Sequence, residues 1–177
     1  MIAYKVLRSG SVGPFSGHVW PRPRDGAAGA WVLAATGGAI CRDAVHGCRA
    51  VDLPWWLDDE LWEAEFDGPV ATGRHKISAP RARLLRRVDG WHHAGARRFA
   101  EACAQRAHER ARAIEPDAGG VVLAMAAGAA QCAQTGAAAV TAYIAAQVAG
   151  RVGGRDAMAA ERTWQAAWLR AELGLRA

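Results

Sequence analysis

A change in composition near residue 90 constrains the fold of this 177-residue chain more than any other feature. Before it, short apolar runs are interrupted by glycine and proline, a pattern typical of strands and turns. After Trp91, alanine dominates and apolar residues recur at helical spacing. We therefore expect an α+β protein. A small, mainly antiparallel β-rich half would occupy residues 1–90, and an alanine-rich helical bundle would occupy residues 91–177.

The first half contains several segments with the length and alternation of strands. Residues 2–8 and 61–66 alternate most clearly. Further strand candidates are residues 31–35, 70–77 and 81–88, with an irregular or extended piece over 41–49. A helical turn is expected to start at Asp52, because Pro54 suits a first turn. Six tryptophans are expected to form the sheet core and its junction to the helices: Trp20, Trp31, Trp55, Trp56, Trp62 and Trp91.

The second half has the signals of three or four helices. Residues 94–114 form the first, ended by Pro116. Asp117 is a candidate N-cap for the second, which Gly136 breaks or bends before residues 137–149. A glycine turn at 150–154 precedes a last helix that Asp156 caps and Gly174 ends as the C′ residue. Two sets of residues are expected to share helix faces: Phe99, Cys103, Ala107 and Ala111, and Trp164 with Trp168.

The chain is basic, with a formal net charge of +5 and a pI of about 9.5. Arginine supplies almost all of this charge, because Lys5 and Lys76 are the only lysines. If the last two strands pair, their arginines form a cationic ribbon that could bind nucleic acid, another polyanion or an acidic partner. A solvated outer face is the alternative. The ribbon consists of Arg81, Arg83, Arg86 and Arg87.

Two thiols and an imidazole lie close together at Cys41, His46 and Cys48. Such a set could bind zinc, or a cysteine could act as a nucleophile with the histidine. No fourth ligand stands at a familiar spacing, so we expect no metal and a buried, structural cysteine pair. The first residues lack the pattern of a signal peptide, which leads us to expect a cytoplasmic protein with reduced thiols. No membrane span is expected, although residues 119–150 carry no charge.

Two carboxylates recur at alternate positions, Glu63 and Glu65, so a strand would place both on one face. They could act as a general base or bind a ribose. A solvated face over an apolar one explains the same alternation. Arg8, at the end of the first strand, could hold a phosphate.

The first 90 residues resemble an uncharacterised bacterial and phage domain family that reads Y-K-F, C-x-x-G-[IF]-H-x-C, E-V-E-x-x-G and then basic strands. The matching residues run from Tyr4 through Cys41, Val45-His46-Gly47-Cys48 and residues 61–68 to Lys76-Ile77 and Arg83-Leu84-Leu85-Arg86. Ala44 stands where that family usually has glycine. In its order of elements the chain also resembles ADP-ribosyltransferases more distantly. That resemblance implies that Arg8 and His46 bind NAD and that Glu65, with Glu63 before it, supports transfer.

Three hypotheses about function follow. The first is an NAD-dependent ADP-ribosyltransferase-like enzyme acting on a nucleic acid or protein, with NAD as its cofactor. The second is a non-catalytic binding or accessory protein that uses its basic strands. The third is a small-molecule tailoring enzyme that uses Cys48 and His46.

Overall fold

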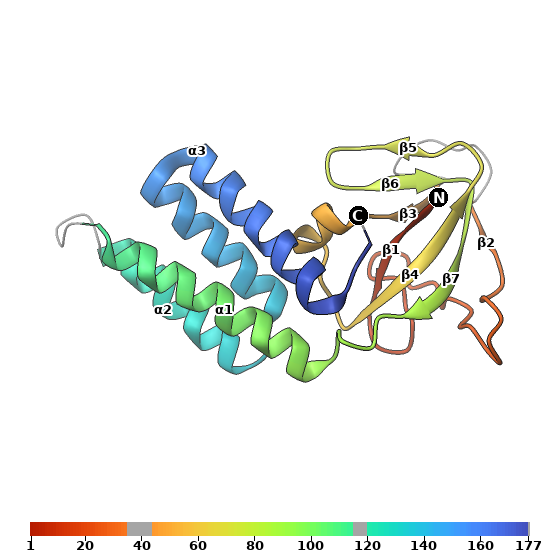
Figure 1. Ribbon diagram of the computed structural model, residues 1–177, viewed down its shortest axis with the longest axis horizontal. Coiled ribbons are helices and arrows are strands. Elements are labelled where there is room, and N and C mark those ends of the chain that lie inside the picture. The colour runs from red at the N-terminus through yellow and green to blue at the C-terminus, as the bar shows by residue number, and fades with distance from the viewer. Residues whose placement is uncertain (35–43, 115–119, 177) are drawn as a thin grey trace. The chain divides into compact units, whose positions relative to one another are not determined.

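The computed structural model describes residues 1–34, 44–114 and 120–176. The fold is α+β, with antiparallel sheets before residue 90 and helices after it, as predicted. The chain forms two compact units, one made of Met1–Gly90 together with Arg176 and the other of Trp91–Leu175 (Figure 1). Across the described ranges no helix combines the length and the apolarity that a membrane crossing needs.

The first unit contains a four-stranded antiparallel sheet in the order β1-β4-β7-β2. Its strands are β1 (Ile2–Leu7), β4 (Glu60–Asp67), β7 (Arg81–Arg87) and β2 (Val32–Leu33). Lys5 lies directly opposite Trp62, and Tyr4 lies opposite Glu63. Because cross-strand partners share a face, Lys5 and Trp62 are on one side of the sheet while Tyr4 and Glu63 are on the other.

A second, smaller sheet has the order β3-β6-β5, formed by β3 (Val45–Gly47), β6 (Ile77–Ala79) and β5 (Ala71–Thr72). The prediction of one strand over residues 70–77 was wrong, because the segment folds back on itself as a hairpin. The Gly73 amide donates a 2.8 Å hydrogen bond to the Lys76 carbonyl in its turn. Beyond β3, backbone hydrogen bonds of 2.9 Å in both directions join Cys48 to Tyr4.

The core of this unit lies between the two sheets. Phe66, Leu84 and Ile77 are fully buried there, and Trp20 and Trp62 are nearly so. The expectation for the other tryptophans needs correction, since Trp55 is 40% exposed and Trp31 packs under the Arg81 and Arg83 guanidinium groups. Trp55 ends a short 3₁₀ helix, η1 (Ala50–Trp55), which has Asp52 in its first turn and Pro54 inside it.

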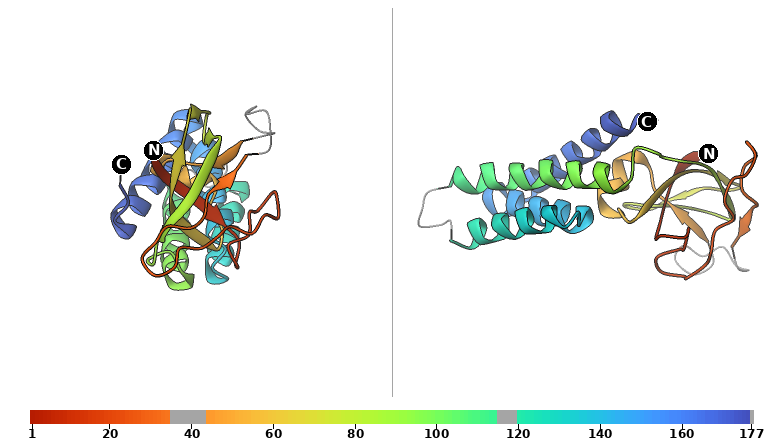
Figure 2. Two further views of the ribbon diagram at one scale, coloured as in Figure 1. Left: turned by 90° about the vertical axis from the view of Figure 1, so that its right-hand side faces the viewer. Right: turned by 90° about the horizontal axis from the view of Figure 1, so that it is seen from below.

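Three helices form the second unit, and each contacts the other two (Figure 1, Figure 2). They are α1 (His93–Arg112), α2 (Gly120–Gln134) and α3 (Ala138–Leu173). The expected turn near residue 150 is confirmed as a kink, since Gly153 and Gly154 leave helical geometry inside α3. Gly174 ends α3 in the left-handed conformation, as predicted. The candidate N-cap Asp117 lies outside the described residues.

Side chains from α1 and α3 form the centre of the helical unit. The predicted face of α1 is confirmed, because all four of its members, Phe99, Cys103, Ala107 and Ala111, are buried. Glu161 on α3 is fully buried. Its Oε2 atom forms ion pairs with Arg106 Nε at 3.0 Å and with Arg110 Nη1 at 2.6 Å. Trp164 stacks under Arg106, and Trp168 contacts Phe99 at a ring-centroid distance of 5.2 Å.

Candidate functional site

The carboxylates of β4 pair with the arginines of β7 across the sheet. The Glu63 carboxylate accepts two hydrogen bonds from Arg86, at 2.6 and 2.8 Å, and Glu65 accepts one from Arg83 at 2.7 Å. Arg81 pairs with Asp67 in the same way. The expected cationic ribbon is therefore largely neutralised by an acidic strand beside it, which reduces the positive potential that a polyanion would meet.

The residues implied by the transferase resemblance do not come together. Glu63 and Glu65 lie on the face of the sheet opposite to Lys5, because side chains alternate along β4. Arg8 is exposed, and its Nε atom lies 4.0 Å from Asp58. Arg87 is also exposed and lies on β7. His46 alone among the expected site residues Arg8, His46, Glu63 and Glu65 lines the pocket described next.

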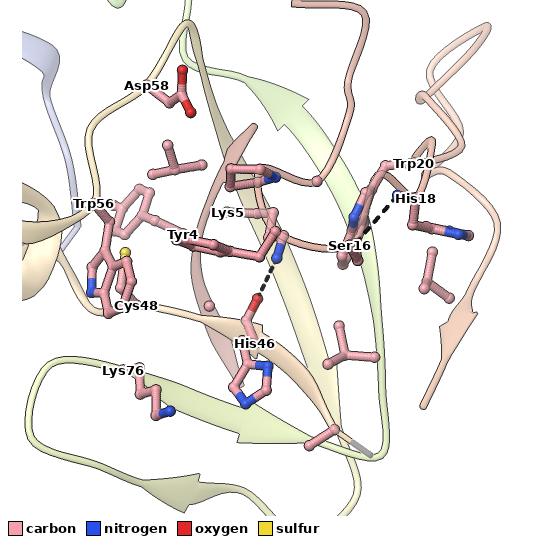
Figure 3. A pocket seen from close by; sticks show the side chains of 18 of the residues that line it. Tyr4, Lys5, Ser16, His18, Trp20, His46, Cys48, Trp56, Asp58 and Lys76 are labelled. Carbon is pink, nitrogen blue, oxygen red and sulfur yellow. Dashed lines mark hydrogen bonds between the residues drawn. The ribbon is translucent and has the colours of Figure 1, made fainter. Parts of the chain in front are cut away.

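A pocket with a volume of about 670 Å³ opens in the β-rich unit (Figure 3). Its walls come from β1, β3, the end of η1 and the segment 13–20, and they are mostly apolar. Phe15 and Trp56 meet edge to face at a centroid distance of 6.3 Å, which gives one wall an aromatic surface. A volume of this size is typical of sites for small organic ligands.

Lys5 projects into this pocket from β1. Its Nζ atom donates a 2.7 Å hydrogen bond to the carbonyl oxygen of His46 and lies 4.8 Å from the centre of the Trp20 ring (Figure 3). The residues before and after it on the same face of β1, Ala3 and Leu7, are buried in the core. No ion pair in the described part of the chain includes Lys5, whereas the arginines of this unit find carboxylates repeatedly.

Burial sets the protonation of this amine. Removal from water disfavours the charged form and lowers the pKa of Lys5 from 10.5 to about 8, although the nearby Cys48 thiol acts in the opposite direction. At neutral pH the amine is still mostly an ammonium ion. The pocket therefore contains a partly buried cation whose only polar contacts in the described structure are a carbonyl oxygen and an aromatic face.

His46 on β3 and Cys48, which directly follows that strand, both line the pocket. Burial lowers the pKa of His46, and the Lys76 and Lys5 charges lower it further, so the imidazole is neutral at pH 7. Burial raises the pKa of the Cys48 thiol to about 12, with Asp52 acting in the same direction. A thiol held in its protonated form is a poor nucleophile, so the geometry does not favour Cys48 chemistry.

The same segment contains the thiol and imidazole groups that could bind a metal ion. Cys48, Cys103 and Cys132 are free thiols, while Cys41 lies outside the described residues. Among the residues that the structure describes, no three His, Cys, Asp or Glu side chains converge so as to hold a metal ion. His75, the histidine of the neighbouring hairpin, stacks on Trp55 at a ring-centroid distance of 4.2 Å and lies 3.6 Å from an Asp52 oxygen.

One residue of the sequence, Lys5, indicates that a pocket lies here. Lys5 is the one charged residue on a strand face that otherwise carries Ala3 and Leu7, and such a lysine must either find a partner or face a cavity. Lys76, the other lysine of the chain, also lines the pocket. The aromatic wall has no local signal, because it joins segments 13–20 and 55–57, which are distant in sequence.

Comparison of the chain with protein-family models, with curated proteins and with solved structures found no match.

Proposed function

We propose that the β-rich unit is a binding module whose pocket takes a small organic anion with a planar, apolar part. The observation that carries this proposal is the Lys5 ammonium group, which lies in a largely apolar pocket and has no carboxylate within 4.0 Å among residues 1–34, 44–114 and 120–176. A charge withdrawn from water is costly unless it is paired. A ligand carboxylate or phosphate would supply the missing counter-ion.

The aromatic residues that line the pocket support the planar, apolar part of the proposed ligand. Phe15, Trp56 and Trp20 present ring surfaces, and ring surfaces favour planar groups that stack or meet them edge-on. Phe15 is 87% exposed in the free protein, so a ligand that covered it would remove a large apolar side chain from water. Charge and aromatic contact together favour an aromatic carboxylate or phosphate over a simple inorganic ion.

Binding of an anionic ligand is also part of two hypotheses from the sequence, the binding module and the NAD-dependent enzyme. A binding module without catalysis was expected to use the β7 arginines, but the ion pairs with Glu63, Glu65 and Asp67 leave the Lys5 pocket as the better anion site. NAD, which the transferase resemblance implied, combines phosphates with aromatic rings and so belongs to the same ligand class. It is one of the test ligands for that reason.

The experiment is calorimetric titration with benzoate, pyridoxine 5′-phosphate, AMP and NAD at neutral pH. We expect at least one of them to bind saturably with a millimolar or lower Kd. Lys5→Met should weaken that binding by about 10- to 100-fold, since hydrogen bonds to charged groups contribute about 1.5 to 3 kcal/mol.

Arg24→Met is the matched control, because it removes one positive charge from an exposed position outside the pocket. This variant should bind like the wild-type protein. Saturable binding that Lys5→Met leaves unchanged, or no binding of any of the four compounds at millimolar concentration, would overturn the proposal.

A further inference from the structure

The distribution of lysine in this chain suggests that the pocket does more than hold an anion. Of 22 lysine and arginine residues, only Lys5 and Lys76 are lysines, and both line this one pocket. Arginine would grip a carboxylate or phosphate at least as well, because its planar fork donates two parallel hydrogen bonds. What lysine offers and arginine does not is an amine that can lose its proton and react.

The surroundings of Lys5 favour that reactive form. The amine contacts the His46 carbonyl oxygen and the face of Trp20, and among the described residues no carboxylate lies within 4.0 Å of it, although Asp58 also lines the pocket. Burial lowers its pKa to about 8, so roughly a tenth of the amine is uncharged at pH 7. Desolvation in an apolar pocket is a recognised way of activating a lysine for attack on a carbonyl carbon.

Other nucleophiles of the pocket are less suited to this step. The Cys48 thiol is buried and stays protonated. Ser16 accepts a hydrogen bond from the His18 amide at 3.2 Å, and within residues 1–34, 44–114 and 120–176 its hydroxyl has no basic side chain as a hydrogen-bond partner. Lys5 is therefore better matched to covalent bond formation than Cys48 or Ser16, and the test below distinguishes it from Lys76, the other amine that lines the pocket.

We propose that Lys5 forms an imine with an aldehyde or ketone that also carries an anionic group. The uncharged Nζ atom attacks the carbonyl carbon, a C–N bond forms, and the carbonyl π electrons move to oxygen. One amine proton moves to that oxygen to give the carbinolamine, and the second leaves with the hydroxyl group as water, so that a C=N bond to Lys5 remains with no oxidation or reduction. This inference rests on the proposed function, because the anionic part of the same ligand must first be bound in the pocket.

The test uses two probes that share a ring and a phosphate. Pyridoxal 5′-phosphate carries an aldehyde, whereas pyridoxine 5′-phosphate carries an alcohol in its place and cannot form an imine. The folded protein is incubated with the aldehyde and treated with borohydride, and the reduced adduct is located by peptide mass spectrometry. The modified peptide should gain the mass of the aldehyde less one oxygen atom.

We expect the adduct on Lys5, and we expect excess pyridoxine 5′-phosphate to protect against it. Lys5→Arg, with its fold checked by circular dichroism, should lose the adduct, because a guanidinium group does not form an imine under these conditions. If pyridoxine 5′-phosphate binds but no adduct is trapped at Lys5, the imine inference is wrong and the binding proposal stands. An adduct confined to Lys76 or the Met1 amino group also contradicts it. If none of the non-aldehyde ligands binds either, both proposals fail.

Discussion

The Nζ atom of Lys5 on β1 donates a 2.7 Å hydrogen bond to the carbonyl oxygen of His46 on β3. This contact lies beside the paired backbone hydrogen bonds between Tyr4 and Cys48, so the two strands are joined at adjacent positions by main chain and by side chain. The ammonium group is held at a fixed place in the pocket wall as a result. A fixed cation is a better anion site than a mobile one, because little side-chain entropy remains to be lost on binding.

The first prediction concerns stability against pH. Below about pH 8 the Lys5 amine is charged in both folded and unfolded protein, and the folded state bears the full cost of desolvation. Between about pH 8 and 10.5 the folded amine is neutral while the unfolded one keeps its proton, so this residue's contribution to stability rises with pH. The melting temperature of wild type relative to Lys5→Met should therefore rise through this window.

The Cys48 thiol adds its own pH dependence to the stability of both proteins. Its pKa is raised from 9.0 to about 12, so it makes the folded state less stable as pH rises above about 9. Both proteins contain this thiol and His46, so their difference in melting temperature reports the Lys5 amine together with its charge coupling to these two groups. A pH-independent difference would contradict the account.

The second prediction concerns the ion pairs of β4 and β7. Arg86→Ala should destabilise the protein by about 2 kcal/mol, because it leaves the Glu63 carboxylate, whose side chain is 4% exposed, without its partner. Arg81→Ala is the matched control on the same strand, and its partner Asp67 is well exposed, so the loss should be clearly smaller. Urea unfolding measures both. Equal losses would contradict the claim that burial of Glu63 makes its ion pair contribute more to stability than the exposed pair.

The third prediction concerns the close approach of β3 to the sheet. A Cβ atom at Gly47 would overlap the Phe66 ring and lie 2.8 Å from the Tyr4 carbonyl oxygen. Gly47→Ala should therefore cost about 1 to 3 kcal/mol and weaken ligand binding. Gly128→Ala in α2 has open space and should stabilise the protein by up to about 1 kcal/mol. Thermal unfolding of the two variants should give shifts of opposite sign, and a neutral Gly47→Ala would refute the packing described.

The fourth prediction concerns the helical unit. Trp168 packs against the fully buried Phe99, so Trp168→Ala should cost about 3 kcal/mol in unfolding free energy. Tyr143→Ala is the control, because Tyr143 is also an aromatic residue of α3 but is 53% exposed, and its loss should cost less than about 0.5 kcal/mol. A change of that small size at Trp168 would show that the end of α3 packs loosely.

Local patterns predicted much of the fold. Alternation placed Glu63 and Glu65 on one face of β4, four-residue spacing found the buried face of α1, and Gly174 marked the end of α3. Each of these depends on residues close together in the chain. The hairpin at 71–79 was missed because its turn, between Gly73 and Lys76, lacks a two-residue turn signature.

The candidate site was harder to predict, because register and non-local pairing decide it. A bulge shifts the register between Glu63 and Ala64, so that Glu63 faces Arg86 and not Leu85. The sequence alone does not show this register, so the carboxylates of β4 and the arginines of β7 were predicted as two separate sites. The pocket likewise depends on the contact of β1 with β3, about 40 residues apart in sequence, for which no local pattern exists.

The central claim is tested most directly by observing the Lys5 amine itself. Lysine labelled with ¹³C at Cε and ¹⁵N at Nζ gives only two side-chain signals in this protein, which Lys76→Arg assigns. We predict that Lys5 titrates with a pKa of about 8 in the free protein. Saturation with pyridoxine 5′-phosphate, or with whichever of the four ligands binds, should raise this pKa, because a bound anion favours the ammonium form. A Lys5 pKa at the ordinary value of 10.5 in the free protein, or one that a bound ligand leaves unchanged, would contradict the account.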